Sequence, residues 1–153
     1  MVGLVVVRRQ DVDALLGLSV APEQQRFVAS NSVTLAQAAY NPSSTVCGVW
    51  KDDTPIGLVA WVDASHPEAE LDPEDEPDCL YLWRLMIGHQ WQRRGFGREI
   101  LAQLERRARV QQRSFLYVSA VEGPGSPLAF YEKAGFRRTG AISDGEVVLR
   151  LPL

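Results

Sequence analysis

Two glycines and three arginines are concentrated in one short stretch of the chain, which reads Gln92, Arg93, Arg94, Gly95, Phe96, Gly97 and Arg98. Because glycine has no Cβ, a turn built on Gly95 and Gly97 can adopt positive φ and let a ligand lie against bare backbone. The arginines surround the same turn with positive charge. These residue types and their spacing predict a binding site for a phosphate or diphosphate group.

The backbone of this turn can bind an anion if it lies between a strand and a helix. Residues 80–87 form an apolar run that predicts a buried strand, and a helix is expected from about residue 95 to residue 111. The apolar face of that helix consists of Ile100, Leu101, Leu104 and Ala108. The free N–H groups of its first turn then converge on one point, with the positive end of the helix dipole behind them.

The pattern differs from two common phosphate-binding motifs. No G-K-[ST] follows the glycines, as a Walker loop requires, and the third glycine and distal acid of a dinucleotide-binding unit are missing. It resembles instead the core motif of the GNAT superfamily of N-acetyltransferases, in which an apolar strand is followed by [QR]-x-x-G-x-[GA] and a helix. A second segment, from Ser126 to Phe136, resembles the closing block of that superfamily, where a tyrosine, here Tyr131, precedes a Gly-Phe pair. The resemblance implies transfer of an acetyl group from acetyl-CoA to a primary amine.

Most of the chain is similar to one branch of the superfamily, the bacterial spermine/spermidine (diamine) N-acetyltransferases. The similar stretches are YLWRLMIGHQWQRRGFG, residues 25–31 with 35–38, and the part from Thr139 to Leu149. This similarity implies a small-molecule amine acceptor, with a polyamine or diamine as the leading candidate. Small enzymes of this type are often dimers, so the resemblance is also compatible with a homodimer.

The resemblance implies a binding site for acetyl-CoA along the predicted strand and turn. The diphosphate is expected on Gln92, Arg93, Arg94, Gly95, Phe96, Gly97 and Arg98. In the superfamily the motif strand and its parallel neighbour splay apart, so the two amides of the pantetheine arm can bond to the exposed strand edge. Main-chain atoms of Leu85, Met86 and Ile87 are therefore expected to bind the cofactor, together with Ser126 and Tyr131. For Ser126 the preferred role is to cap the following helix, and a hydrogen bond to coenzyme A is the alternative.

Tyr131 is expected to be the catalytic acid, by its place in the closing motif. When an amine attacks a thioester, the departing thiolate needs a proton or a strong hydrogen bond. A phenol, with a pKa of about 10, is close enough to a thiol, with a pKa of about 8.5, to provide either. The alternative is a packing tyrosine whose hydroxyl bonds to a nearby carbonyl.

The sequence does not indicate which residue is the base that would accept the proton of the amine. Many polyamine acetyltransferases carry one acid after the strand motif and another in the segment that matches residues 27–30, but these positions are Gly88 and Ala29 here. Arg84, in the middle of the apolar strand, has two interpretations. It either pairs with a carboxylate or with carbonyls to support the strand, or it recognises an acidic group of the acceptor, which would oppose a polyamine substrate.

The order of the predicted elements indicates a mixed α/β fold in a single domain that spans residues 1–153. Strands are expected at 4–8, 46–51, 56–63, 80–87, 115–119, 136–141 and 146–151. Because hairpin-connected strands precede and follow one long helix, the sheet is expected to be mostly antiparallel, with helices on both faces. Its one parallel pair would be the strands near residues 84 and 117.

Composition narrows the possible partners. The net charge of −3 argues against a nucleic-acid-binding protein. No apolar run approaches the roughly 20 residues needed to span a bilayer, so no membrane partner is expected and the protein is interpreted as cytoplasmic. Cys47 and Cys79 stand alone in strand-like contexts, and His66 and His89 are far apart, so no metal site is predicted.

Residues 66–78, HPEAELDPEDEPD, form an acidic stretch between two predicted strands. It is interpreted either as a solvated loop or as a surface that attracts a polycationic acceptor. Three functions stay open on the sequence alone: acetylation of a small amine, acetylation of a protein amine or amino-acid-like substrate, and binding of acetyl-CoA with weak or no catalysis.

Overall fold

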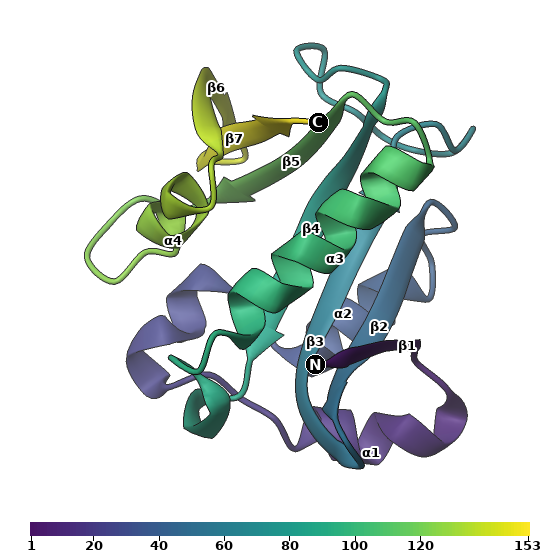
Figure 1. The fold of residues 1–153 in the computed structure, drawn as a ribbon, viewed down its shortest axis with the longest axis vertical. Helices are drawn as coiled ribbons and strands as arrows, with labels where there is room; N and C mark the ends of the chain where they lie inside the picture. Colours follow the sequence, from purple (N-terminus) through teal and green to yellow (C-terminus); the bar gives the residue numbers. More distant parts are fainter.

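A seven-stranded sheet with the strand order β1-β2-β3-β4-β5-β7-β6 runs through the centre of the molecule (Figure 1). The computed structural model describes residues 1–153. The strands are β1 (Gly3–Val6), β2 (Ser44–Lys51), β3 (Thr54–Asp63), β4 (Cys79–Ile87), β5 (Phe115–Ala120), β6 (Arg137–Ser143) and β7 (Glu146–Pro152). The α-helices are α1 (Val12–Leu16), α2 (Asn31–Ala38), α3 (Phe96–Val110) and α4 (Leu128–Lys133), and the 3-10 helices are η1 (Arg9–Asp11), η2 (Pro22–Phe27) and η3 (His89–Trp91).

The pairing of β4 with β5 is the one parallel pairing in the sheet, which confirms the predicted mixed topology. It extends only from Cys79 opposite Phe115 to Leu82 opposite Val118. Beyond Leu82, β4 continues to Ile87 with β3 as its only partner, while β5 continues beside β7. The two strands therefore diverge toward the carboxyl end of β4, as the separation of β4 from β5 in Figure 1 shows.

Helices cover both faces of the sheet. Figure 1 shows α3 crossing in front of β4, with α1 and α2 behind the sheet. The buried face of α3, formed by Ile100, Leu101, Leu104 and Ala108, belongs to the same core cluster as Leu80 and Leu82 of β4. On the opposite face, Leu15 of α1 packs with Leu58 of β3 and Met86 of β4. None of the helices has the length and apolar character needed to cross a membrane.

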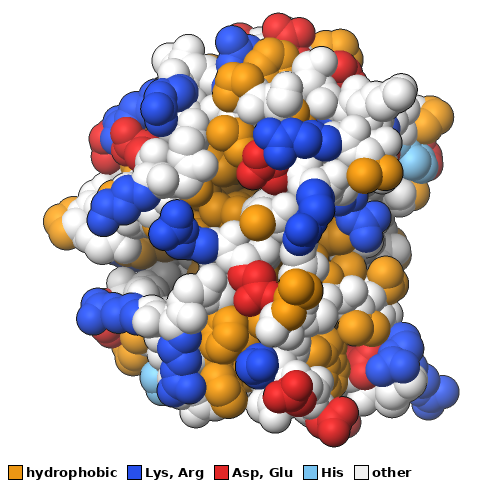
Figure 2. Space-filling model, in the orientation of Figure 1, with side chains coloured by type: hydrophobic (Ala, Val, Ile, Leu, Met, Phe, Trp, Pro, Cys, Tyr) orange, Lys and Arg blue, Asp and Glu red, His pale blue; other side chains and the backbone are white.

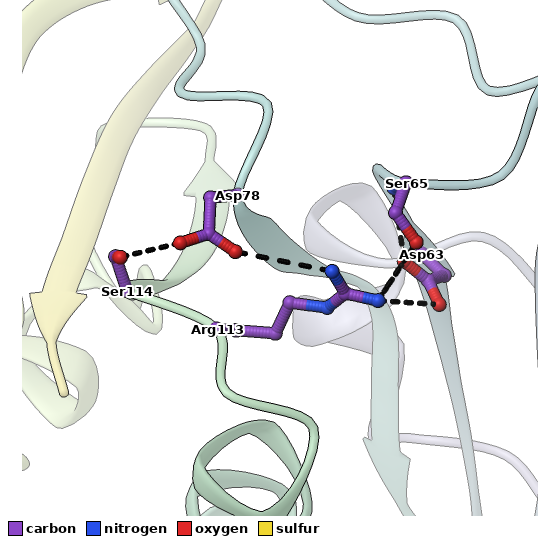
Figure 3. Close-up of polar contacts among 5 residues, drawn as sticks. All are labelled: Asp63, Ser65, Asp78, Arg113 and Ser114. Atoms are coloured by element: carbon purple, nitrogen blue, oxygen red, sulfur yellow. Dashed lines mark hydrogen bonds and ion pairs between the residues drawn. The ribbon is translucent and has the colours of Figure 1, made fainter.

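An ion-pair network holds the start of β4 close to the end of β3 (Figure 3). Arg113, which follows α3, donates from Nη2 to Asp63 and to Ser65 Oγ, at 3.0 Å and 2.7 Å, and its Nη1 lies 3.8 Å from Asp78. Ser114 donates to Asp78 from the other side. The acidic residues 66–78 form the loop that joins β3 to β4, so the acidic stretch is anchored at the end of β4 opposite the glycine turn.

Candidate active site

A cavity of about 1,000 Å³ opens where β4 and β5 separate. Its walls come from η2 and the residues that follow it, the second half of β4, the start of α3, the end of β5, the loop before α4, and Tyr131 of α4. Figure 2 shows a hollow at the left edge of this face, between α4 and η2, with Lys and Arg side chains on both sides of it. The cavity thus lies where the sequence pattern placed a ligand.

Every site residue predicted from the sequence except Arg94 lines this cavity. They are Leu85, Met86, Ile87, Gln92, Arg93, Gly95, Phe96, Gly97, Arg98, Ser126 and Tyr131. Arg94 is directed elsewhere, because its guanidinium donates to the Gln90 carbonyl at 3.0 Å and lies 5.1 Å from the centre of the Trp91 ring. Its charge still belongs to the turn, but its side chain is not part of the cavity wall.

The start of α3 presents unpaired backbone donors to the cavity. Gly95 precedes the helix with φ 86°, a left-handed conformation that glycine adopts without a Cβ clash. The helical hydrogen bonds begin with the N–H of Glu99 donating to the Gly95 carbonyl at 3.2 Å. The N–H groups of Phe96, Gly97 and Arg98 therefore have no acceptor within the helix, and they carry the positive end of its dipole.

Gly97 lets α4 approach the first turn of α3. A Cβ at this position would lie 3.0 Å from Cζ of Phe130, which is closer than side chains ordinarily pack. The ring of Phe130 in turn packs edge-on against Tyr131, with 5.2 Å between the ring centres. The glycine pattern therefore serves two purposes, since it bares the backbone of the turn and brings Tyr131 close to it.

Gln92 lines the cavity but is bound to protein groups. Its Nε2 donates to the Ile87 carbonyl at 2.9 Å and to Oε1 of Gln24 at 2.9 Å, and Gln24 donates back to Oε1 of Gln92 at 3.0 Å. Gln24 belongs to η2, so this pair fixes η2 to the end of β4. On the far side, Arg26 of η2 donates to the Pro124 carbonyl at 2.8 Å. The η2 segment therefore connects the two walls of the cavity.

The exposed edge of β4 can be assigned residue by residue from its pairing with β3. The N–H of Gly88 donates to the Ile56 carbonyl at 2.9 Å, and Met86 pairs with Leu58 two positions earlier. Because successive residues of an antiparallel strand direct their backbone groups to opposite sides, the N–H and C=O of Leu85 and Ile87 face away from β3. Of these, the Ile87 carbonyl accepts the hydrogen bond from Gln92, while the main chain of Met86 is committed to β3.

Tyr131 is 6% exposed and its ring lies between Phe130 and Phe136. Its hydroxyl makes no hydrogen bond to a protein carbonyl, in contrast to a purely structural tyrosine. Burial raises the pKa of the Tyr131 hydroxyl well above its ordinary value, and the negative charge of Glu146 raises it further. The phenol therefore stays protonated at neutral pH, where it can act as a hydrogen-bond donor.

Ser126 lies directly before Pro127, which is the N-cap residue of α4, and the helix begins at Leu128. Its hydroxyl donates to the Val121 carbonyl at 2.6 Å and accepts from the N–H of Leu128 at 3.2 Å. The hydroxyl proton is thus already used within the loop, and any ligand contact of Ser126 would be made through an oxygen lone pair.

Sequence reasoning missed the cavity residues that come from other elements. Glu146, the first residue of β7, is the single carboxylate among the lining residues, and it accepts a hydrogen bond from Ser119 Oγ at 2.6 Å. Residues 24–29 of η2 and the segment after it also line the cavity, whereas the sequence had drawn attention to residues 27–30 only because polyamine acetyltransferases often carry an acid there. The Asp-Gly turn before Glu146 predicts a hairpin, but no local signal indicates that β7 lies next to β5.

No group of three or more His, Cys, Asp or Glu side chains is arranged to hold a metal ion. The charged lining residues are Arg26, Arg84, Arg93, Arg98 and Glu146. The arrangement can therefore bind an anion at the start of α3 and donate a hydrogen bond from Tyr131, and it offers a separate carboxylate on β7.

Comparisons with solved structures identify the fold. An acetyltransferase from Thermus thermophilus has a TM-score of 0.76 at 19% identity, with 100% of this chain and 97% of that chain covered. The PaiA N-acetyltransferase from Thermoplasma acidophilum, solved with coenzyme A, has a TM-score of 0.70 at 12% identity, with 100% and 99% covered. The aminoglycoside acetyltransferase AAC(6')-Ib, also solved with coenzyme A, has a TM-score of 0.79 at 15% identity, with 99% and 95% covered.

The comparison with curated proteins gave no match. The model of the acetyltransferase (GNAT) family matches residues 18–136, which include β4, the glycine turn, α3 and Tyr131. Since this match covers most of the chain, the protein belongs to the acetyltransferase (GNAT) family and is an acetyl-CoA-dependent acyltransferase.

Proposed function

We propose that the protein transfers the acetyl group of acetyl-CoA to the primary amine of a small molecule bound in the cavity between β4 and β5. The observation that supports this most directly is the end of β4–β5 pairing at Leu82 and Val118, where the cavity opens between the first turn of α3 and Tyr131. One cavity then holds an anion site, an open strand edge and a phenol, which are the three features that the reaction requires.

The residues of the cavity fit the parts of coenzyme A. The free N–H groups of Phe96, Gly97 and Arg98 suit a diphosphate, and the guanidinium groups of Arg93 and Arg98 add positive charge at the cavity wall. Leu85 offers an unpaired N–H and C=O on the strand edge, which match the amides of the pantetheine arm. Ser126, Met86 and Ile87 complete the lining proposed for the cofactor, with Gln92 holding the turn in place.

The chemistry follows from the same residues. Acetyl-CoA supplies a thioester carbonyl that a neutral amine can attack. Tyr131 is proposed to donate a hydrogen bond, and then a proton, to the departing sulfur. Burial raises the pKa of this phenol, so the hydroxyl still carries its proton when the thiolate forms.

The acceptor is a small amine rather than a polycation. Once Arg93 and Arg98 bind the diphosphate, the charges left in the cavity are Arg26, Arg84 and Glu146, so a spermidine-like acceptor with several ammonium groups would meet more positive than negative charge. The acidic residues 66–78, which could have attracted such a molecule, lie at the other end of β4 and are absent from the lining. The polyamine acceptor implied by the sequence resemblance is therefore the weaker candidate.

Calorimetry tests the cofactor part of the proposal. Coenzyme A and acetyl-CoA should each bind with one molecule per chain, and the affinity should fall as salt is raised. Arg98→Gln should weaken binding by about 2- to 10-fold, because an exposed contact of a charge with phosphate contributes about 0.5–1.5 kcal/mol. Arg106→Gln, on an exposed position of the same helix, is the matched control and should leave the affinity unchanged.

Release of the coenzyme A thiol, measured across an acceptor panel, tests the transfer itself. Turnover of small amines supports the proposal. Turnover restricted to peptides would replace it with acetylation of a protein amine, and binding of acetyl-CoA without turnover of any amine would reduce the protein to a binding module. Absence of coenzyme A binding by a folded protein would reject the proposal entirely.

A further inference from the structure

Arg84 carries a charge that no acidic group of the protein neutralises. It is half-buried in β4, where its Nη2 donates to Oε1 of Gln37 at 3.2 Å and its Nη1 donates to the Trp83 carbonyl at 3.1 Å. Its Nε is buried without any acceptor. The guanidinium therefore has only neutral partners, although it lines a cavity in which another residue carries the opposite charge.

The residue of opposite charge is Glu146, which likewise has no charged partner in the protein. Its carboxylate is partly buried at the start of β7, accepts a hydrogen bond from the neutral hydroxyl of Ser119, and forms no ion pair. It is nevertheless close enough to Arg84 that its charge raises the pKa of the guanidinium, against a larger lowering caused by burial. The charge of Glu146 also raises the pKa of Tyr81 of β4 and of Tyr131 of α4, in each case as a smaller effect than burial.

The two side chains lie on the same face of the sheet, opposite α3. Glu146 is two residues before Val148, which packs with Tyr117 in a cluster separate from the α3 core, and Arg84 is two residues before Met86, which packs against α1. Side chains two positions apart in a strand share a face. Tyr131 and the start of α3 lie toward the other face. The gap between β4 and β5 thus separates a cofactor side from a side with one positive and one negative charge.

Two half-buried charges of opposite sign that do not pair with each other are costly, because each loses hydration without gaining an ionic partner. A ligand that carries both charges would compensate both at once. We propose that Arg84 and Glu146 form the acceptor subsite, in which Arg84 binds a carboxylate of the acceptor and Glu146 accepts a proton from its ammonium group. The acceptor class is therefore an amino-acid-like amine, and this inference rests on the proposed acetyl transfer.

The proton balance of the reaction closes with these residues. Glu146 takes one proton from the ammonium, which leaves a neutral amine whose nitrogen forms a bond to the thioester carbon. The carbon–sulfur bond then breaks, and Tyr131 gives its proton to the sulfur. The nitrogen loses its second proton as the amide forms, which restores the phenol, and Glu146 releases the first proton to solvent. The products are the N-acetyl amino acid, coenzyme A thiol and one proton.

Matched pairs of acceptors test the role of the carboxylate. The twenty standard amino acids are assayed by thiol release with acetyl-CoA, and each active one is compared with the amine that lacks its α-carboxylate, for example lysine with cadaverine. Spermidine is included. We expect kcat/KM to favour the amino acid of the best pair by about 10- to 100-fold, as the loss of one charged hydrogen-bonded contact predicts.

Single substitutions test the roles of Arg84 and Glu146 separately. Arg84→Gln should bring the ratio between amino acid and decarboxylated amine close to one, mainly through KM, and Arg84→Lys should restore part of the preference because the charge remains. Glu146→Gln should lower kcat by about 100-fold or more near pH 7, with the loss shrinking as pH rises and the amine becomes neutral by itself. Asp144→Asn, in the same hairpin but outside the cavity, is the control for Glu146, and Arg106→Gln is the control for Arg84.

The outcomes distinguish this inference from the proposed function. If spermidine or cadaverine is the better acceptor, if no amino acid is turned over, or if Arg84→Gln keeps the preference, the acceptor subsite is wrong while acetyl transfer stands. If coenzyme A does not bind, the proposed function fails first. Each variant must bind coenzyme A with the affinity of the unmodified protein. This control ensures that a loss of activity caused by misfolding is not mistaken for a change in specificity.

Discussion

The surroundings of Tyr131 determine both the pKa of its hydroxyl and whether the hydroxyl is free to donate a hydrogen bond. Phe130 and Phe136 pack against the ring on the α3 side of the sheet, and Tyr131 lines the cavity with no protein acceptor for its hydroxyl. Burial first, and the charge of Glu146 second, raise the pKa of this phenol. A raised pKa makes the group a weaker acid, but it also keeps the hydroxyl protonated, and so able to donate a hydrogen bond, at neutral pH.

Replacing Tyr131 by phenylalanine should lower kcat by about 100-fold or more, because the departing sulfur loses its proton donor while the ring packing remains. Coenzyme A affinity and thermal stability should stay close to those of the unmodified protein. Rates are measured by thiol release with saturating substrates. Tyr40→Phe is the control, since Tyr40 is 90% exposed and lies outside the cavity. Equal turnover by Tyr131→Phe, with chemistry rate-limiting, would exclude Tyr131 as the acid.

Individual cavity residues could be predicted from the sequence where they belong to a short local motif. Gly95, Gly97 and Tyr131 stand in short motifs that are read within one or two turns of chain, and all three line the cavity. Glu146 and Ser119 could not be found this way. They come together because β7 inserts between β5 and β6, and such a pairing depends on contacts between distant segments rather than on local pattern.

The start of α3 is the element on which the proposed anion site depends. Its N-terminal N–H groups are aligned only if the chain enters the helix through the left-handed conformation of Gly95. Arg93, two residues earlier, also has positive φ, at 60°, which is uncommon for a residue with a side chain. Two left-handed residues so close together indicate that the turn is held by its surroundings, in particular by the bonds of Gln92.

Gly95→Ala should weaken coenzyme A binding, because alanine disfavours positive φ by about 1–2 kcal/mol and the turn can relax only by moving the free N–H groups. Gly140→Ala is a matched control: its φ is 90°, a Cβ there also meets open space, and the residue lies in β6 outside the cavity. Both variants should lose similar thermal stability, and only Gly95→Ala should lose affinity in calorimetry. An equal loss of affinity in both would contradict the assignment.

Elements with a regular repeat of apolar residues were predictable from the sequence. Elements held by hydrogen bonds to distant parts of the chain were not. The expected limits of α3 agree with the structure to within a residue, because its buried stripe repeats over four turns. Pro22, a residue type typical of the start of an α-helix, instead begins the 3-10 helix η2. It buries no side chain fully and depends on Gln24 and Arg26, whose partners lie 68 and 98 residues further along the chain. Such partners leave no periodic signal in the segment itself.

The whole molecule contains two cysteines, each buried and free. Burial raises the pKa of Cys47 to about 11, with Arg107 opposing the effect. Burial, reinforced by nearby carboxylates such as Asp75, raises the pKa of Cys79 to about 12. The folded protein therefore keeps both thiols protonated above the ordinary value of 9.0, while the unfolded chain releases their protons.

Stability should consequently be unaffected by these thiols below about pH 9 and should decline as pH rises from 9 toward 11 and 12, because the unfolded state then binds fewer protons than the folded state. Urea unfolding midpoints at pH 7, 9 and 10, measured with reductant present, give the slope. Replacing both cysteines by alanine should lower stability at every pH but flatten the decline. An unchanged slope would assign the alkaline loss to other groups.

In the proposed transfer, the divergence of β4 and β5 also determines how the thioester and the amine can meet. Because the gap passes between the strands, the thioester and the amine can approach from opposite sides of the sheet and occupy the protein together. Neither needs to leave before the other arrives, and the two protonated, inaccessible thiols offer no nucleophile to hold the acetyl group in between. The separation of two strands thus favours direct transfer within a ternary complex over a relay through an acylated protein.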